Sequence, residues 1–146
     1  MTDAYYIKRE DTFVGKKLKF GETAANKFVR LAKRESGAWS RPVHETWEID
    51  GNVNELTASL NHQSTVSIAE FVKKIDTYST SNAEYLYKQG VRASWWQIMV
   101  YPLAKFFKDY IILQGFRDGT HGFVHAMMMS MHSFLTRAKL YFYEAS

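Results

Sequence analysis

The sequence predicts an α+β fold in which short strands occupy the first 65 residues and three helices occupy the rest. Segments with β-branched and aromatic residues dominate up to about residue 65, and apolar residues then recur at helical spacing. The 146 residues suffice for one domain with a core. With 46% hydrophobic and 23% charged residues, the composition is that of a folded chain.

Four segments of the first part are predicted to be strands: residues 4–8, 27–32, 46–49 and 53–60. Asp50-Gly51 lies between the last two of them, and an Asp-Gly pair flanked by strands is typical of a hairpin. We therefore expect a partial mixed β-sheet that contains this hairpin.

The first helix is predicted over residues 67–89, where apolar residues follow one stripe. Ser67 and Glu70 form a capping-box pattern at its start, and Gly90 is a natural stop at its end. This start marks the boundary between the strand-rich and the helical part of the chain.

Two further helices are predicted over residues 93–113 and 118–143. Pro102 lies inside the first of these and predicts a kink or a break there. Gly115 closes that helix, and the last helix carries a broad apolar face.

The charge and the cysteine count restrict the function. The formal net charge is +4 with a pI near 9.2, which favours anionic partners such as phosphates, acidic lipids or nucleic acid without choosing among them. The absence of cysteine excludes disulfides, a thiol nucleophile and a cysteine-based zinc site, and it fits a cytoplasmic protein. There is no run of 18 apolar residues and no signal peptide at the N-terminus.

Aromatic residues make up 16% of the chain and gather in the second helix together with two lysines. This mixture suits a helix that lies in a membrane interface, and it equally suits a helix that buries its rings against the other two. The residues are Trp95, Trp96, Tyr101, Phe106, Phe107 and Tyr110, with Lys105 and Lys108.

Three histidines project to nearly one side of the last helix. His121 and His125 have a spacing that could hold a metal, but Gly122 stands where helical zinc sites carry a glutamate, and His132 lies two turns away from His125. We therefore predict no metal site and expect a polar stripe that faces solvent or another subunit.

The stretch Arg41-Pro42-Val43-His44-Glu45 is the strongest chemical motif of the sequence. A carboxylate beside an imidazole, after a turn set by proline and before a strand, is a plausible position for a general base.

This stretch is one of six short motifs that occur in a fixed order. The others are residues 28–31 (FVRL), 60–62 (LNH), 73–79 (KKIDTYS), 101–106 (YPLAKF) and 115–119 (GFRDG). The ordered set resembles the C-terminal, acceptor-side half of bacterial family-2 glycosyltransferases of the lipopolysaccharide-core type. The resemblance covers nearly all of the chain.

The resemblance implies a GT-A type fold and two regions. Residues 1–65 would be the acceptor-side half of the glycosyltransferase domain, without its donor-binding half, and residues 66–146 a helical membrane-interface segment. The complete enzyme would be an inverting glycosyltransferase that moves a hexose-like unit from a nucleotide sugar to a lipid-linked or saccharide acceptor, in lipopolysaccharide or other cell-envelope polysaccharide synthesis.

Site residues follow from the same resemblance. Glu45 stands where these enzymes place the catalytic base, and His44 would orient or tune it. Arg30, Arg41 and His62 would bind substrate.

The donor side is expected outside this sequence. The D-x-D motif that holds a divalent cation, Mg²⁺ or Mn²⁺, does not occur here, so we expect the chain alone to be inactive. The expected partners are the donor-binding half, the two substrates and an anionic membrane surface, which places the protein at the cytoplasmic face of the membrane.

Two other functions are weighed against this one. A non-catalytic membrane-interface or protein-interaction module derived from such an enzyme is the alternative. A nucleic-acid binder is not predicted, because Lys16, Lys17 and Lys19 form the only tight basic cluster and no RNA-binding motif surrounds them.

Overall fold

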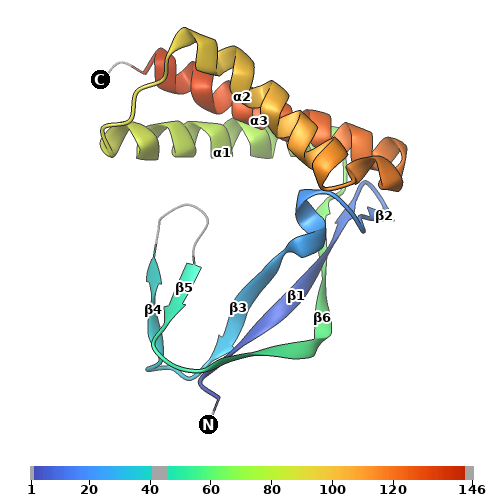
Figure 1. Cartoon of the computed structure of the whole chain (residues 1–146), viewed down its shortest axis with the longest axis vertical. Coiled ribbons are helices and arrows are strands. Elements are labelled where there is room, and N and C mark those ends of the chain that lie inside the picture. Colours follow the sequence, from blue (N-terminus) through green and yellow to red (C-terminus); the bar gives the residue numbers. More distant parts are fainter. Residues whose placement is uncertain (1, 41–45, 144–146) are drawn as a thin grey trace.

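The computed structural model describes residues 2–40 and 46–143, and in this part the chain forms two small β-sheets below a layer of helices (Figure 1). The larger sheet has four strands, of which β1 (Ala4–Phe13) is the central one. Two strands pair with β1 antiparallel, and the long last strand pairs with it parallel. These partners are β2 (Lys16–Lys17), β3 (Lys27–Ala32) and β6 (Val53–Thr65).

The smaller sheet shows that the predicted Asp50-Gly51 hairpin is wrong. Strand β5 (Thr46–Ile49) pairs antiparallel with β4 (Gly37–Ser40), and β6 pairs with β1 instead of β5. The chain crosses from one sheet to the other at residues 50–52.

The N-terminal segment explains this crossing. The backbone N–H groups of Asp3 and Ala4 donate to the carbonyl oxygen of Asn52 at 2.9 and 3.3 Å. The Asp3 carboxylate in turn accepts the N–H of Asn52 at 3.2 Å. These bonds hold the residues after the turn beside the start of β1, so β6 continues along β1.

The first helix forms where the sequence predicts it. Helix α1 spans Ile68–Lys88, and the Ser67 hydroxyl caps it by accepting the N–H of Glu70 at 3.2 Å. The Glu70 carboxylate accepts the N–H of Val66 at 3.1 Å, so both polar side chains of the predicted capping pattern satisfy free donors at the helix start.

The second helix continues through Pro102. Helix α2 spans Trp95–Phe107 without a break, and a π-helical segment, η2 (Lys108–Ile112), extends it. The carbonyl oxygen of Pro102 accepts the hydroxyl of Ser130 at 2.8 Å, which links α2 to the last helix. That helix, α3, spans Thr120–Tyr141.

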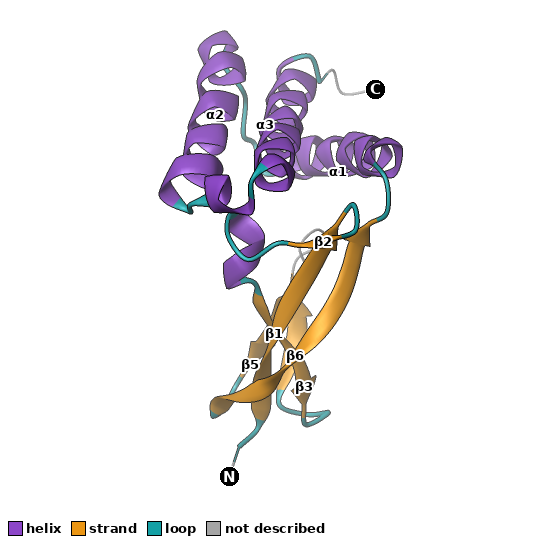
Figure 2. Cartoon of the chain, turned by 90° about the vertical axis from the view of Figure 1, so that its right-hand side faces the viewer, coloured by secondary structure: helices purple, strands orange, loops and turns teal. Residues whose placement is uncertain are grey.

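The three helices form a layer with α3 in the middle. Helix α3 packs against α1 on one side and α2 on the other, and α1 is the helix directly above the sheet (Figure 2). The change from strand to helix falls between Thr65 and Ile68, as predicted, so the α+β class is confirmed.

Residues 115–119, one of the six motifs, tie the helices to the sheet. The buried Asp118 carboxylate accepts hydrogen bonds from the N–H groups of Lys19 and Phe20 at 2.9 and 2.8 Å. The backbone carbonyl oxygen of Asp118 accepts a hydrogen bond from the Lys16 ammonium. A methyl group at Gly122 would overlap the carbonyl oxygen of Gly115, so only glycine fits there. This motif therefore has a structural role.

The described part of the chain buries few large apolar side chains and exposes many. Phe13 and Leu140 are the largest apolar side chains that are fully buried. Helix α2 contains no buried residue, and Trp95 is 70% exposed. An apolar surface of this extent is typical of a site that contacts other protein or lipid. None of the helices described is long and apolar enough to span a membrane.

Candidate functional site

One face of the larger sheet carries a line of charged and aromatic side chains, which we call the arginine–histidine row. Alternate residues of a strand share a face, so Arg9 and Asp11 on β1 lie on the same side as their neighbours Phe28 and Arg30 on β3. His62 on β6 is the register partner of Asp11 and completes the row.

Asp11 is the centre of the row. Its side chain is 1% exposed, and its Oδ1 lies 2.7 Å from Nδ1 of His62. On its other side, the Arg9 guanidinium contacts the same carboxylate, with Nε 3.0 Å from Oδ1 and an Nη donor 3.0 Å from Oδ2. A buried carboxylate needs such partners, because an unpaired charge away from water is costly.

This arrangement orients the imidazole of His62. An ionised carboxylate can only accept a hydrogen bond, so Nδ1 of His62 is the protonated nitrogen and Nε2 of the neutral ring is the acceptor. The His62 side chain is 49% exposed. It can therefore accept a hydrogen bond, or a proton, from a hydroxyl group of a bound molecule.

The other end of the row is basic and aromatic. The Phe28 ring lies under two guanidinium groups, with its centroid 4.8 Å from Cζ of Arg9 and 5.4 Å from Cζ of Arg30. Arg30 is at the bulge opposite Tyr5 and Tyr6, five residues from the level of Asp11, so it lies about 17 Å along the sheet from His62. The structure places Arg30 and His62, two of the three predicted substrate-binding residues, on one face, but it does not bring them together.

The predicted catalytic pair is not covered by the structure. His44, Glu45 and the third predicted substrate-binding residue, Arg41, all lie outside the described residues. Their roles remain predictions.

A second cluster of charges lies where the sheet meets the helices. The Lys105 ammonium is 2.7 Å from Oε1 of Glu22, in the short helix η1 (Glu22–Ala25), and 3.5 Å from Oδ2 of Asp109 in η2. Both Asp109 oxygens and the second Glu22 oxygen are buried without a hydrogen-bond partner among the described residues. Lys105 thus points into this junction and does not belong to an interfacial surface, contrary to the expectation from the sequence.

His125 corrects the predicted polar stripe on the last helix. Its ring packs against two aromatic rings that also contact each other, with centroids 5.3 Å from Phe13 and 5.8 Å from Phe71. Burial lowers the pKa of the His125 imidazole below its usual value, so the neutral ring is favoured. The expectation of a stripe facing solvent or a subunit is wrong for this residue, because strand β1 and helix α1 cover it.

The junction gives a prediction for stability. Burial raises the pKa of Asp109 above its ordinary value, and the charge of Glu22 raises it further. The ionised form therefore destabilises the fold at neutral pH, and this cost is lost as the pH falls through the raised pKa. We expect Asp109→Asn to raise Tm at pH 7 by about 2–5 °C, and the gain to shrink as the pH is lowered.

Thermal unfolding followed by circular dichroism between pH 4 and pH 8 measures this effect. The exposed substitution Asp50→Asn is the matched control and should leave Tm unchanged. A lower Tm for Asp109→Asn at pH 7 would show that the Asp109 charge stabilises the junction through Lys105.

The described residues do not fit a divalent cation. Nowhere in residues 2–40 and 46–143 are three or more histidine, aspartate or glutamate side chains grouped so that they could hold a metal ion. In the junction, the Lys105 ammonium already lies between the two carboxylates.

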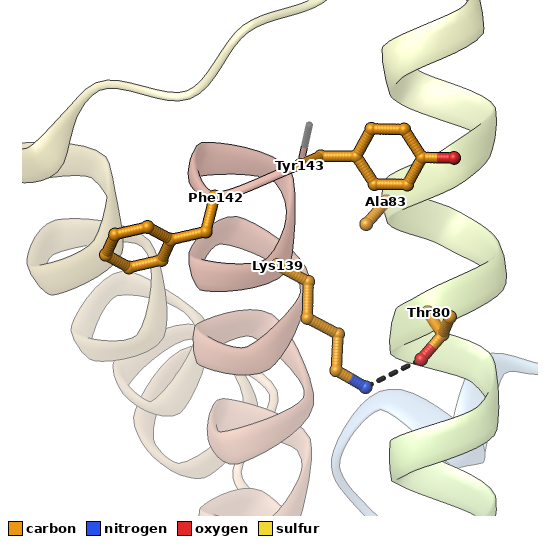
Figure 3. Close-up of a pocket in the computed structure, with 5 residues that line it drawn as sticks. All are labelled: Thr80, Ala83, Lys139, Phe142 and Tyr143. Atoms are coloured by element: carbon orange, nitrogen blue, oxygen red, sulfur yellow. Dashed lines mark hydrogen bonds between the residues drawn. The ribbon is translucent and has the colours of Figure 1, made fainter. Parts of the chain in front are cut away.

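A hollow of about 430 Å³ lies between α1 and the end of α3 (Figure 3). Its one charged group, Lys139, already donates to Oδ1 of Asp76, Oγ of Ser79 and Oγ1 of Thr80 at 2.7–2.9 Å. The other side chains around it include Phe142 and Tyr143. With its only cation paired, this hollow is a weak candidate for a polar ligand.

Comparison with known proteins relates the chain to glycosyltransferases. It is 34% identical over 116 residues to the lipopolysaccharide core biosynthesis glycosyltransferase LpsC of Rhizobium meliloti, a match that covers 77% of this chain and 43% of that protein. It is 30% identical over 125 residues to an uncharacterized glycosyltransferase of Rickettsia felis, covering 79% of this chain and 44% of the relative. An uncharacterized glycosyltransferase of Rickettsia typhi is 27% identical over 147 residues, a match that covers 94% of this chain and 50% of the relative.

The chain thus spans about half the length of the curated relatives it matches. No protein-family model matches it, and no solved structure gives a significant match. The matches confirm the resemblance inferred from the ordered motifs: the chain is related to bacterial glycosyltransferases, and one of these relatives is named for lipopolysaccharide core biosynthesis.

Asp11 and Asp109 are the residues of interest that the sequence analysis missed. A signal for Asp11 exists, because the alternation Arg9, Asp11, Phe13 places a lone carboxylate on the face of a buried aromatic ring. No comparable signal marks Asp109, since its burial depends on η1 and on the π-helical segment.

Proposed function

We propose that the chain is the acceptor-side part of an inverting GT-A type glycosyltransferase. The complete protein would transfer a hexose-like unit from a nucleotide sugar to a lipid-linked or saccharide acceptor in lipopolysaccharide core or related polysaccharide synthesis. The observation that carries this proposal is the 34% identity to LpsC over 77% of the chain.

The reaction assigns one role to Glu45. The oxygen of an acceptor hydroxyl forms a bond to the anomeric carbon, and the bond from that carbon to the diphosphate oxygen breaks. The diphosphate leaves with the electron pair, and Glu45 takes the hydroxyl proton, with His44 beside it. The divalent cation that would neutralise the diphosphate belongs to the donor part in this proposal.

The arginine–histidine row supports binding of the acceptor. Nε2 of His62 would accept a hydrogen bond from an acceptor hydroxyl, because Asp11 fixes the ring in the required form. At the other end of the row, Arg30 would contact an anionic group of the same extended acceptor. Arg41, which lies outside the described residues, is proposed as a further substrate-binding residue from the sequence alone. A separation of about 17 Å suits an oligosaccharide or lipid-linked molecule better than a single sugar.

The exposed face of α2 supports contact with an anionic membrane at the cytoplasmic side. Trp95, Met99, Leu103 and Phe107 follow one another at intervals of four residues and are all strongly exposed. The charged Lys105 is turned away into the junction, so this face is apolar. Such a face, on a protein with a net charge of +4, suits the headgroup region of an anionic bilayer.

The same face also favours the second candidate function, a non-catalytic membrane-interface or protein-interaction module. The two candidates differ in what the chain binds. Only an acceptor-side part should recognise the saccharide acceptor.

A binding experiment on the 146-residue chain separates them. We expect the chain to bind a truncated lipopolysaccharide core oligosaccharide, measured by isothermal titration calorimetry, and not to bind uridine diphosphate sugars. The substitution His62→Ala should weaken oligosaccharide binding by about fivefold or more, since one hydrogen bond is lost. Binding of the nucleotide sugar alone, or binding of neither molecule, contradicts the acceptor-side assignment.

A further inference from the structure

A basic hollow of about 290 Å³ lies at the edge of β1. It forms because residues 18–26 leave the edge of this strand between β2 and β3. Two backbone bonds mark its ends, Leu18 N–H to the carbonyl of Asp11 at 3.0 Å and Arg9 N–H to the carbonyl of Asn26 at 2.9 Å. Its polar lining consists of Lys8, Arg9, Glu10, Lys17, Lys19 and Thr23.

The charges around the hollow do not balance. Four of the lining residues are basic and one is acidic. Glu10 pairs with Lys17, and Arg9 is held by Asp11. In the described part of the chain, the ammonium groups of Lys8 and Lys19 have no ion-pair partner. Two positive charges at this hollow are therefore available to an anion.

A neutral polar group points to the same conclusion. Oγ1 of Thr23 is buried, and no described residue forms a hydrogen bond with it. A buried hydroxyl without a partner is unusual, because the lost hydrogen bond destabilises the fold. The Thr23 residue is only partly buried, so rotation about χ1 would turn this hydroxyl toward a ligand in the hollow, which then supplies the missing acceptor.

We propose that this hollow binds a phosphate group. A phosphate monoester carries a charge of about −1.5 to −2 at neutral pH, which matches the two unpaired ammonium groups, and it has three acceptor oxygens for Lys8, Lys19 and the Thr23 hydroxyl. A carboxylate carries one charge and two oxygens, so it satisfies fewer of these groups. The hollow is large enough to hold part of the molecule to which the phosphate is attached.

This site is independent of the glycosyltransferase proposal, because it requires only that the chain binds phosphate. A phosphate of this kind is found on phosphorylated saccharides and on phospholipid headgroups. The two sources share the chemistry of the hollow and differ in the molecule that carries the phosphate.

The test is a titration of the 146-residue chain with glucose 6-phosphate at about 0.15 M salt, where attraction between exposed charges more than about 8 Å apart is largely screened. Nuclear magnetic resonance shifts of the backbone amides give the dissociation constant. We expect saturable binding, with shifts at residues 8–10 and 17–24, and none with glucose. The double substitution Lys8→Gln/Lys19→Gln should raise the dissociation constant by about tenfold or more.

Two further variants distinguish a specific binding site from nonspecific electrostatic attraction. Lys73→Gln/Lys88→Gln removes the same charge from exposed positions on α1 and should change the dissociation constant less than about twofold. Thr23→Val keeps the shape and the net charge but removes the hydroxyl, and it should weaken binding by about threefold or more. Flotation with phosphatidic acid vesicles, compared with the glucose 6-phosphate titration, then shows which source binds more tightly.

The proposal is overturned if the wild-type chain binds neither probe saturably. It is also overturned if the α1 double variant weakens binding as much as Lys8→Gln/Lys19→Gln, or if Thr23→Val has no effect. None of these outcomes depends on sugar transfer.

Discussion

The substitution Glu45→Gln should lower kcat for sugar transfer by about 10²- to 10⁴-fold in a complete enzyme that contains this chain. Glutamine keeps the size of the side chain and can still form hydrogen bonds, but it cannot take the proton of the acceptor hydroxyl. A general base acts in the transition state, so the affinity for the nucleotide sugar should stay nearly unchanged. Initial rates with a labelled nucleotide sugar, together with donor titration, measure both quantities.

The neighbouring histidine provides the control for this variant. His44→Ala should cost less than Glu45→Gln if the imidazole only orients the carboxylate, and about as much if the imidazole is itself the base. If Glu45→Gln retains more than about a third of the wild-type turnover, which lies well outside that range, Glu45 is not the base and the Val-His-Glu motif is structural.

The second large effect that we expect is on binding of the chain to lipid vesicles. Trp95→Ala/Trp96→Ala should reduce binding of the chain to phosphatidylglycerol vesicles by on the order of 10²-fold. Trp95 is 70% and Trp96 46% exposed, so both rings are available to a bilayer surface, and each would lose about 1.5 kcal/mol of apolar contact. Sedimentation with vesicles at low salt gives the partition coefficient.

A matched double variant on other elements controls for general loss of hydrophobicity. Tyr78→Ala/Leu60→Ala removes two comparably exposed apolar side chains from α1 and β6 and should leave vesicle binding nearly unchanged. Equal losses in both double variants would mean that the α2 face is not the membrane contact. Unchanged vesicle binding by Trp95→Ala/Trp96→Ala would also mean that the α2 face is not the membrane contact.

The positions of the strands and helices could be predicted because they follow from local patterns. Period-two segments and a capped amphipathic stripe are properties of neighbouring residues, and β3, β5 and α1 begin and end where these patterns do. The pairing of the strands could not be predicted from local patterns. An Asp-Gly turn favours a hairpin locally, but the bonds between Asn52 and residues 3–4 depend on a segment far away in the sequence.

The candidate site was predictable only in part, for a similar reason. Arg30 and His62 could be found as members of motifs. Asp11, the partner of His62, belongs to none of the six motifs and gains its importance from the parallel pairing of β1 with β6. His125 looked like part of a polar helix stripe because the sequence does not reveal that Phe13 and Phe71 enclose it. Burial of polar groups follows from tertiary contacts, which single-sequence patterns do not specify.

Sugar transfer by a protein that joins residues 1–146 to a donor-binding half with a D-x-D motif tests the central proposal most directly. Labelled product should form from a nucleotide sugar and a truncated lipopolysaccharide acceptor when both parts are present, and either part alone should form none. If the joined and correctly folded protein binds the nucleotide sugar but forms no product, or if the donor half transfers sugar equally well without this chain, the chain is not the acceptor-side part of a glycosyltransferase.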